Sequence, residues 1–162
     1  MNRVHLKKKE AKRVQERISQ ALKIDRSDAF NRKASFEAVY IDVEKTVFLI
    51  DGKPEFIEVD GEIFPALINA SVLNQLPSIT VDMGAVPHIC NGANVMAPGV
   101  TKVNGSFNTD SIIVVLEERY LKKIAIAKAL YNSNEIANKK QGRVAENLHY
   151  ISDKFWTLFK DR

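Results

Sequence analysis

The spacing of apolar residues changes near residue 35, and this change limits the chain to folds that combine helices with strands. Before residue 23, apolar side chains recur mostly every three or four positions among Lys, Arg, Glu and Gln, which predicts an amphipathic helix from about residue 4. After residue 35, short apolar runs alternate with turn residues. Asp51-Gly52 separates the runs 47–50 and 56–59, which predicts a β-hairpin.

The remaining elements are short and divide the chain into two halves. The boundary is predicted at Leu76-Pro77-Ser78, giving domains of residues 1–76 and 77–162. Asn132 is expected to cap a helix that Gly142 ends. The other predicted elements are a helix within 63–76 and strands at 36–42, 78–82, 112–116, 124–127 and 148–158.

The composition excludes several classes of protein. Cys90 is the single cysteine among 162 residues, so one chain has no internal disulfide and no Cys₄ or Cys₂His₂ zinc site. The three histidines lie far apart, and the nucleophile-elbow and P-loop patterns are absent. No run of 18 apolar residues exists, and the basic start lacks an apolar signal core. We therefore expect a cytoplasmic protein with no membrane span, no metal, no cofactor and no enzymatic activity.

Basic and acidic side chains are segregated along the chain. Residues 1–33 carry 11 basic and 4 acidic side chains, residues 34–118 carry 3 and 12, and residues 119–162 carry 10 and 4, although the net charge is only +4. Sequence does not show which charges share a face, so two interpretations stay open. Either the basic ends neutralise the acidic middle, or they form a basic face for a polyanion.

Residues 79–100, ITVDMGAVPHICNGANVMAPGV, predict a strand, a short helix, a glycine corner and another strand. Gly84 and Gly92 are both expected to tolerate positive φ, and Asp82 is expected to accept a turn or cap hydrogen bond. A corner without side-chain bulk lets a phosphate or sugar approach backbone N–H groups. The alternative is a tight turn that serves only the fold.

Several strings carry a resemblance to a known family. They are Val81-Asp82-x-Gly84-Ala85, Asn91-Gly92-Ala93-Asn94-Val95-Met96-x-Pro98-Gly99-Val100, Asp110, the strands near 112–116 and 125–129, Ser133-x-Glu135 and Gly142. Together they resemble the signature of the PUA domain. The tail Glu146-Asn147-Leu148-His149-Tyr150-Ile151-Ser152-Asp153-x-x-Trp156 is similar to the end of the malignant-T-cell-amplified-sequence proteins and the related ligatin family.

The resemblance implies a fold and a partner. The fold would be α+β, with a small N-terminal α+β pre-PUA domain followed by a PUA β pseudo-barrel with short helices. The family binds RNA, and its eukaryotic members act with a protein partner on the small ribosomal subunit. This chain lacks the cysteine set of some eukaryotic members and any added partner-type domain, so its minimal architecture resembles the archaeal members.

The resemblance also selects candidate RNA-binding residues. They are Asn91, Gly92, Ala93, Asn94, Val95, Met96, Lys122, Lys128, Arg143, His149 and Tyr150. Backbone N–H groups near Gly92 would contact phosphate or sugar. Asn94 would read a base edge or cap the turn, Met96 would contact RNA or belong to the core, and His149 and Tyr150 would stack on bases or pack at the core and rim. Strand alternation would let Lys122 and Lys128 point together, either toward RNA phosphates or as part of a solvated strand face.

The first helix offers a second basic surface. Its residues are Lys7, Lys8, Lys9, Lys12, Arg13 and Arg17. The alternatives are contact with RNA phosphates and a merely solvated helix face.

Three functions are compatible with these features. The first is a non-enzymatic RNA-binding translation factor that acts with tRNA or rRNA on the small ribosomal subunit. The second is an accessory RNA-targeting module for an RNA-modifying enzyme, of the tRNA transglycosylase or pseudouridine synthase type. The third is a protein–protein adaptor that uses the acidic middle segment.

Overall fold

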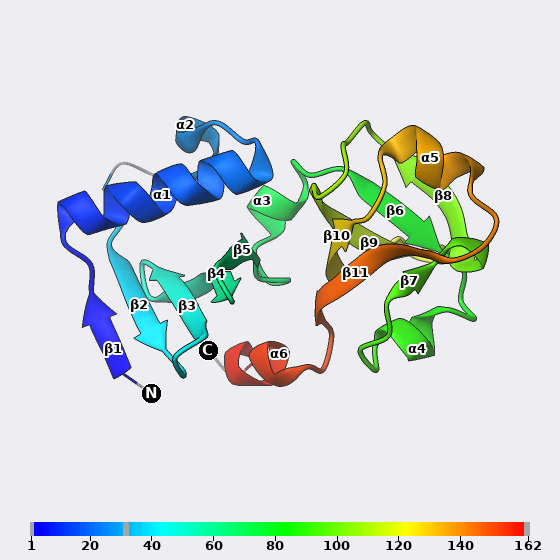
Figure 1. Ribbon diagram of the computed structural model, residues 1–162. Helices are drawn as coiled ribbons and strands as arrows, with labels where there is room; N and C mark the ends of the chain where they lie inside the picture. Colours follow the sequence, from blue (N-terminus) through cyan, green and yellow to red (C-terminus); the bar gives the residue numbers. More distant parts are fainter. Residues whose placement is uncertain (1, 31–32, 161–162) are drawn as a thin grey trace. The chain divides into compact units, whose positions relative to one another are not determined.

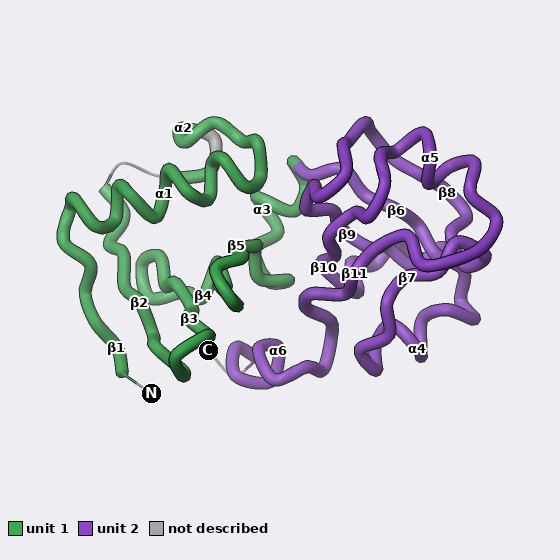
Figure 2. The backbone as a smooth tube through the Cα atoms, viewed as in Figure 1, with its two compact units in different colours: residues 1–75, 162 green, residues 76–161 purple. Residues whose placement is uncertain are grey.

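The computed structural model describes residues 2–30 and 33–160. The chain divides into two compact units between residues 75 and 76, next to the predicted boundary (Figures 1 and 2). The last two residues of the predicted second domain lie outside the described residues. Within the described ranges, no helix is long and apolar enough to cross a membrane.

Unit 1 is a five-stranded antiparallel sheet in the order β1-β2-β3-β4-β5, accompanied by helices. Figure 1 shows the long helix α1 running across this sheet. The elements are β1 (Asn2–His5), α1 (Lys8–Leu22), α2 (Arg26–Ala29), β2 (Phe36–Tyr40), β3 (Lys45–Ile50), β4 (Lys53–Val59), β5 (Glu62–Pro65) and α3 (Ala70–Leu73).

The predicted hairpin is confirmed as β3 and β4. Asp51 and Gly52 both take positive φ, at 51° and 79°, which is the conformation of a tight two-residue hairpin turn. Along α1, Ala11, Ile18 and Leu22 are buried, in keeping with the predicted amphipathic pattern. Short-range turn chemistry and helical spacing therefore determine these elements.

Two predictions in unit 1 are wrong at element edges. The first helix begins at Lys8 rather than near residue 4, because residues 2–5 pair with β2 and place Val4 opposite Ala38. Residues 62–65 form β5 rather than helix, because the turn at Asp60-Gly61 folds them back onto β4. In both cases pairing with a neighbouring strand overrides the local spacing signal.

Unit 2 is a curved six-stranded sheet in the order β7-β11-β10-β9-β6-β8. The described neighbours are antiparallel except β6 and β9, which run parallel. The elements are β6 (Ser78–Val81), α4 (Val86–Ile89), β7 (Val95–Met96), the 3₁₀ turn η1 (Ala97–Gly99), β8 (Val100–Asn104), β9 (Ile112–Glu117), β10 (Lys123–Ala129), α5 (Ser133–Asn138), β11 (Arg143–Tyr150) and α6 (Lys154–Phe159).

The end of unit 2 differs from the prediction of one last strand over 148–158. The strand β11 ends at Tyr150, and residues 154–159 form α6. Asp153 caps this helix, because its carboxylate accepts the N–H of Trp156 at 2.8 Å. The predicted cap at Asn132 is confirmed by a 2.9 Å bond from Glu135 N–H, although α5 ends at Asn138, ahead of Gly142.

The core of unit 2 supports a prediction about independent folding. Its buried cluster draws only on residues within 79–145, for example Ile79, Ile113, Val115 and Ile136. We expect residues 77–162, expressed alone, to unfold cooperatively and to give a dispersed amide NMR spectrum. Ile113→Ala should lower the free energy of unfolding of this fragment by about 2–5 kcal/mol, because it leaves a cavity. A fragment without a cooperative transition would contradict the predicted domain boundary.

Candidate functional site

Residues 82–99, which we call the glycine corner, contain the predicted short helix, α4, and the predicted turn at Gly92 after it. Asp82 accepts the N–H of Ala85 at 2.9 Å, which confirms its expected role as a turn acceptor. Gly99 passes so close that a Cβ atom there would lie 3.1 Å from the Cβ of Ala85. Small side chains at residues 85 and 99 therefore let the two ends of the corner meet.

Gly92 follows α4 and needs to be glycine for two reasons. Its φ is +96°, a conformation that L side chains rarely adopt, and a Cβ atom would lie 3.2 Å from the Tyr150 hydroxyl oxygen. Gly84 does not take positive φ, so the structure uses this freedom at Gly92 and not at Gly84. The corner at Gly92 thus lies directly against the Tyr150 ring.

The backbone N–H groups of residues 91–93 all donate hydrogen bonds within the chain. Those of Asn91 and Ala93 donate to the His88 carbonyl at 3.1 and 3.0 Å, and that of Gly92 donates to the Ile89 carbonyl at 3.0 Å. These bonds satisfy the carbonyl groups at the end of α4. In this conformation the three N–H groups therefore donate within the chain rather than to a ligand.

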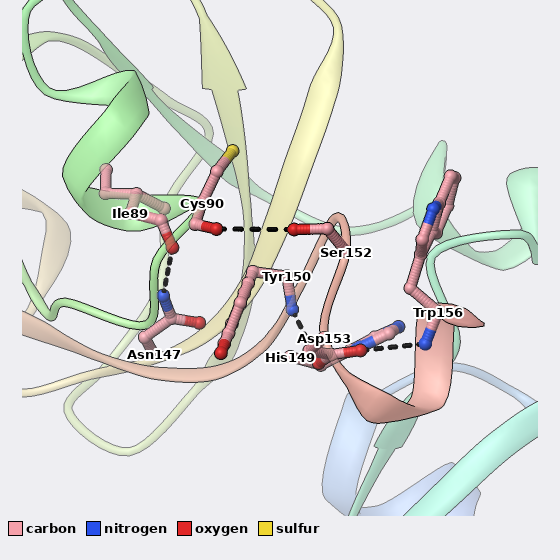
Figure 3. A network of polar contacts seen from close by, with 8 residues as sticks. All are labelled: Ile89, Cys90, Asn147, His149, Tyr150, Ser152, Asp153 and Trp156. Carbon is pink, nitrogen blue, oxygen red and sulfur yellow. Dashed lines mark hydrogen bonds and ion pairs between the residues drawn. The ribbon is translucent and has the colours of Figure 1, made fainter. Parts of the chain in front are cut away.

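Asn147 joins the corner to β11, and sequence reasoning missed this role. Its side-chain Nδ2 donates to the carbonyls of Ile89 and Ala93, both at 3.0 Å (Figure 3 shows the bond to Ile89). Its backbone N–H donates to the Asn94 Oδ1 at 2.9 Å. Asn94 therefore neither caps its own turn nor presents a free oxygen to a base. It holds the corner onto the sheet.

Asp153 fixes the turn after β11. Its carboxylate lies 2.7 Å from the His149 Nδ1 and accepts the N–H of Tyr150 at 2.9 Å (Figure 3). Burial favours a higher pKa for Asp153, but the contacts with His149 and the backbone N–H groups prevail and hold the pKa below its usual value. His149 is 0% exposed, so it stacks on no base, whereas Tyr150 is half-buried under Gly92.

The loop between β9 and β10 lies beside the start of the corner. The Glu118 carboxylate accepts the Met83 N–H at 3.2 Å. Burial raises the pKa of the Cys90 thiol, and the nearby positive charge of Lys122 offsets part of that rise. Among the predicted cations, Lys122 is thus the one whose charge acts on Cys90, the residue that follows α4.

The other predicted residues of unit 2 are dispersed. Val95 is a core residue, while Met96 is 49% exposed and pairs across the sheet with Arg143. Lys128 forms an ion pair with Glu146 at 3.6 Å. Lys122 precedes β10, and register shifts occur at 123–125 and 126–127, so the alternation expected to align it with Lys128 is interrupted.

The six basic residues at the start of the chain do not form one surface. Lys8 and Lys12 line a groove of unit 1 together with Arg26 and Lys33. Arg17 instead binds the Glu58 carboxylate through two hydrogen bonds, at 3.0 and 3.1 Å. Lys7, Lys9 and Arg13 are exposed and do not line the groove.

The described part of the chain gathers no three His, Cys, Asp or Glu side chains that would hold a metal ion. The corner offers exposed Asn91, Gly92 and Ala93, the rim of Tyr150 and the nearby charge of Lys122.

Two family models match the two halves of the chain. The model described as "PUA domain" matches residues 77–151, and the model described as "Domain of unknown function (DUF1947)" matches residues 2–70.

Similar sequences come from archaea and eukaryotes. An uncharacterised protein of Methanocaldococcus jannaschii is 29% identical, covering 96% of each chain. Translation machinery-associated protein 20 of Saccharomyces cerevisiae is 24% identical over 78% of this chain and 74% of its own length. Malignant T-cell-amplified sequence 1 of Rattus norvegicus is 27% identical over 64% of this chain and 59% of its own length.

Solved structures share the fold along almost the whole chain. A hypothetical protein from Pyrococcus horikoshii OT3 has a TM-score of 0.84 and 29% identity, covering 98% of this chain and 99% of that one. A PUA domain from Aeropyrum pernix K1, solved as a tartrate complex, has a TM-score of 0.84 and 26% identity, covering 98% of this chain and 91% of that one.

The lowered pKa of Asp153 predicts a pH-dependent stability. A carboxylate whose pKa falls on folding stabilises the fold above its unfolded pKa, and this contribution disappears as the pH falls through the folded pKa. Asp153→Asn should therefore lower the free energy of unfolding by about 1–3 kcal/mol at neutral pH. Urea unfolding of both proteins should show this difference shrinking below about pH 4. Asp60→Asn, in a turn, is the control; a gap that is constant with pH would contradict the role of the charge.

Proposed function

This chain belongs to the two-domain PUA proteins that include translation machinery-associated protein 20 and malignant T-cell-amplified sequence 1, and we propose that it binds tRNA or rRNA on the small ribosomal subunit. The PUA match and the translation-related names of these relatives support an RNA-binding role connected with translation. The names of the two family models and of these relatives describe no catalytic activity. We therefore propose a binding role alone.

The observation that carries this proposal is the exposed, fixed corner at Gly92. It has no side-chain bulk at Gly92 and little at Ala93, and Asn147 and Tyr150 hold it against the sheet. A rigid, open surface next to a cation fits RNA, which proteins recognise largely through shape, phosphates and unpaired bases. Because the corner N–H groups are engaged, Asn91 and Lys122 are the polar groups that would contact the RNA.

The groove of unit 1 supplies a second cationic surface. Lys8 and Lys12 lie four residues apart on α1 and so share one side of the helix. They face the groove with Arg26. Among the described lining residues, Asp25 has the one carboxylate, and it accepts the Ser27 N–H at 3.3 Å. We assign to this groove the phosphate contacts of the first unit, and this assignment excludes Arg17, which is bound to Glu58.

Charge reversal in the groove tests the RNA-binding proposal. Lys8→Glu/Lys12→Glu should weaken binding to tRNA or small-subunit rRNA, and the slope of log K against log[salt] should become shallower by about 0.7–0.9 for each phosphate that the variant no longer binds. Titration by fluorescence anisotropy over a salt series measures both quantities. Lys9→Glu/Arg13→Glu is the matched control, because it makes the same charge change on the same helix outside the groove.

Two outcomes would count against the proposal. If the unaltered protein binds neither RNA, or binds with an affinity that does not depend on salt, the RNA-binding function is wrong and an adaptor role is favoured. If it binds RNA but does not co-sediment with small ribosomal subunits, the placement on the subunit is wrong and a role as an RNA-targeting module is favoured. If both double variants weaken RNA binding equally, the groove has no specific role in the RNA interface.

A further inference from the structure

Two large apolar side chains are exposed next to each other at the tip of the β9–β10 hairpin. Tyr120 is 80% exposed and Leu121 is 59% exposed. Single exposed apolar side chains are common on protein surfaces. An adjacent pair on a loop whose backbone is held in place calls for a more specific explanation.

The loop is held in one conformation by a buried carboxylate. Glu117 is 4% exposed and accepts the backbone N–H groups of Tyr120 and Lys122. The bond from Lys122 is the main cause that holds the pKa of Glu117 below its usual value. Glu118 ties the other side of the loop to the Met83 N–H. The two carboxylates therefore fix the tip relative to the glycine corner.

The same loop contains a strained residue. Leu121 has a φ of +56°, in the left-handed region, where a non-glycine residue costs about 1–2 kcal/mol. A loop that needed only to connect two strands would avoid this cost with glycine or asparagine. Strain of this kind persists where the surrounding structure enforces it, and it concentrates at functional sites.

Basic residues lie on both sides of Tyr120 and Leu121 in the sequence. Arg119 and Lys122 flank the pair, and Lys123 comes next. The neighbouring acidic groups, Glu117 and Glu118, are both engaged with backbone N–H groups. An exposed aromatic ring between cations matches the platform on which proteins stack unpaired bases while binding the adjacent phosphates. An apolar protein partner would form no favourable electrostatic interaction with these basic side chains.

We propose that Tyr120 stacks on an unpaired base of the bound RNA, with Arg119 and Lys122 contacting the phosphates beside it. This inference rests on the proposed function and extends its interface from the Gly92 corner to the hairpin tip. The Met83–Glu118 hydrogen bond connects the hairpin tip to the glycine corner, because residue 83 lies at the start of that corner. The stacked base must be unpaired, because a base inside a duplex exposes no face to the ring.

The test compares Tyr120→Ala with Tyr120→Phe, which keeps the ring. Tyr120→Ala should weaken binding to tRNA or small-subunit rRNA by about 5- to 150-fold, with little change in the salt slope. Tyr120→Phe should bind nearly as well as the unaltered protein, and both should bind a blunt RNA duplex unchanged. Tyr40→Ala, which removes a 44% exposed tyrosine from unit 1, is the matched control. A thermal melt of each variant confirms that folding is intact.

The outcomes separate this inference from the proposed function. If the unaltered protein binds neither tRNA nor rRNA, the proposed function itself is wrong. If it binds RNA and Tyr120→Ala binds as tightly, the stacking role is overturned while the RNA-binding function stands. Stacking is also overturned if Tyr120→Ala weakens binding to the duplex as much as to tRNA, or if Tyr120→Phe loses as much affinity as Tyr120→Ala.

Discussion

Three hydrogen bonds through Asn147 join segments more than 50 residues apart, and the shape of the candidate interface depends on them. The side-chain amide donates to two carbonyls, one at the end of α4 and one in the turn after it, while the backbone N–H donates to the side chain of Asn94. Because Asn147 and Asn94 are half-buried and Ile89 is buried, losing the amide would leave polar atoms without partners, which costs more than a hydrogen bond between exposed groups. The corner therefore keeps its form without a ligand, and binding of the proposed RNA would cost little free energy for ordering it.

Much of the fold could be predicted because its signals are local. The Asp51-Gly52 turn, the buried run in β9 and the cap at Asn132 each depend on neighbours within a few residues. The error at residues 2–5 arises from distant pairing, because they form a strand only through β2. The error at residues 154–159 is local, because Asp153 interrupts the apolar run and caps the turn after it.

The candidate site was predictable in outline through the resemblance of residues 81–100 to a known signature, but its geometry was not. Sequence placed His149 and Tyr150 together as candidates for stacking, yet adjacent strand residues point to opposite faces, so one is fully buried and the other borders the corner. The roles of Asn147 and Glu117 depend on contacts with backbone atoms. Such contacts leave no pattern in side-chain chemistry, so a sequence provides no signal for them.

The parallel pairing of β6 with β9 bears on when the interface forms. Ser78 lies opposite Val114, so the chain between them must complete a crossover before this pair can join. Contacts of such long sequence separation form late, since the entropy of loop closure is lost before the pairing compensates for it. The Gly92 corner lies inside that crossover, and Asn147 and Tyr150 of β11 hold it against the sheet. During synthesis, the candidate interface therefore cannot be complete until the chain has emerged beyond Tyr150, when unit 2 is almost entirely made.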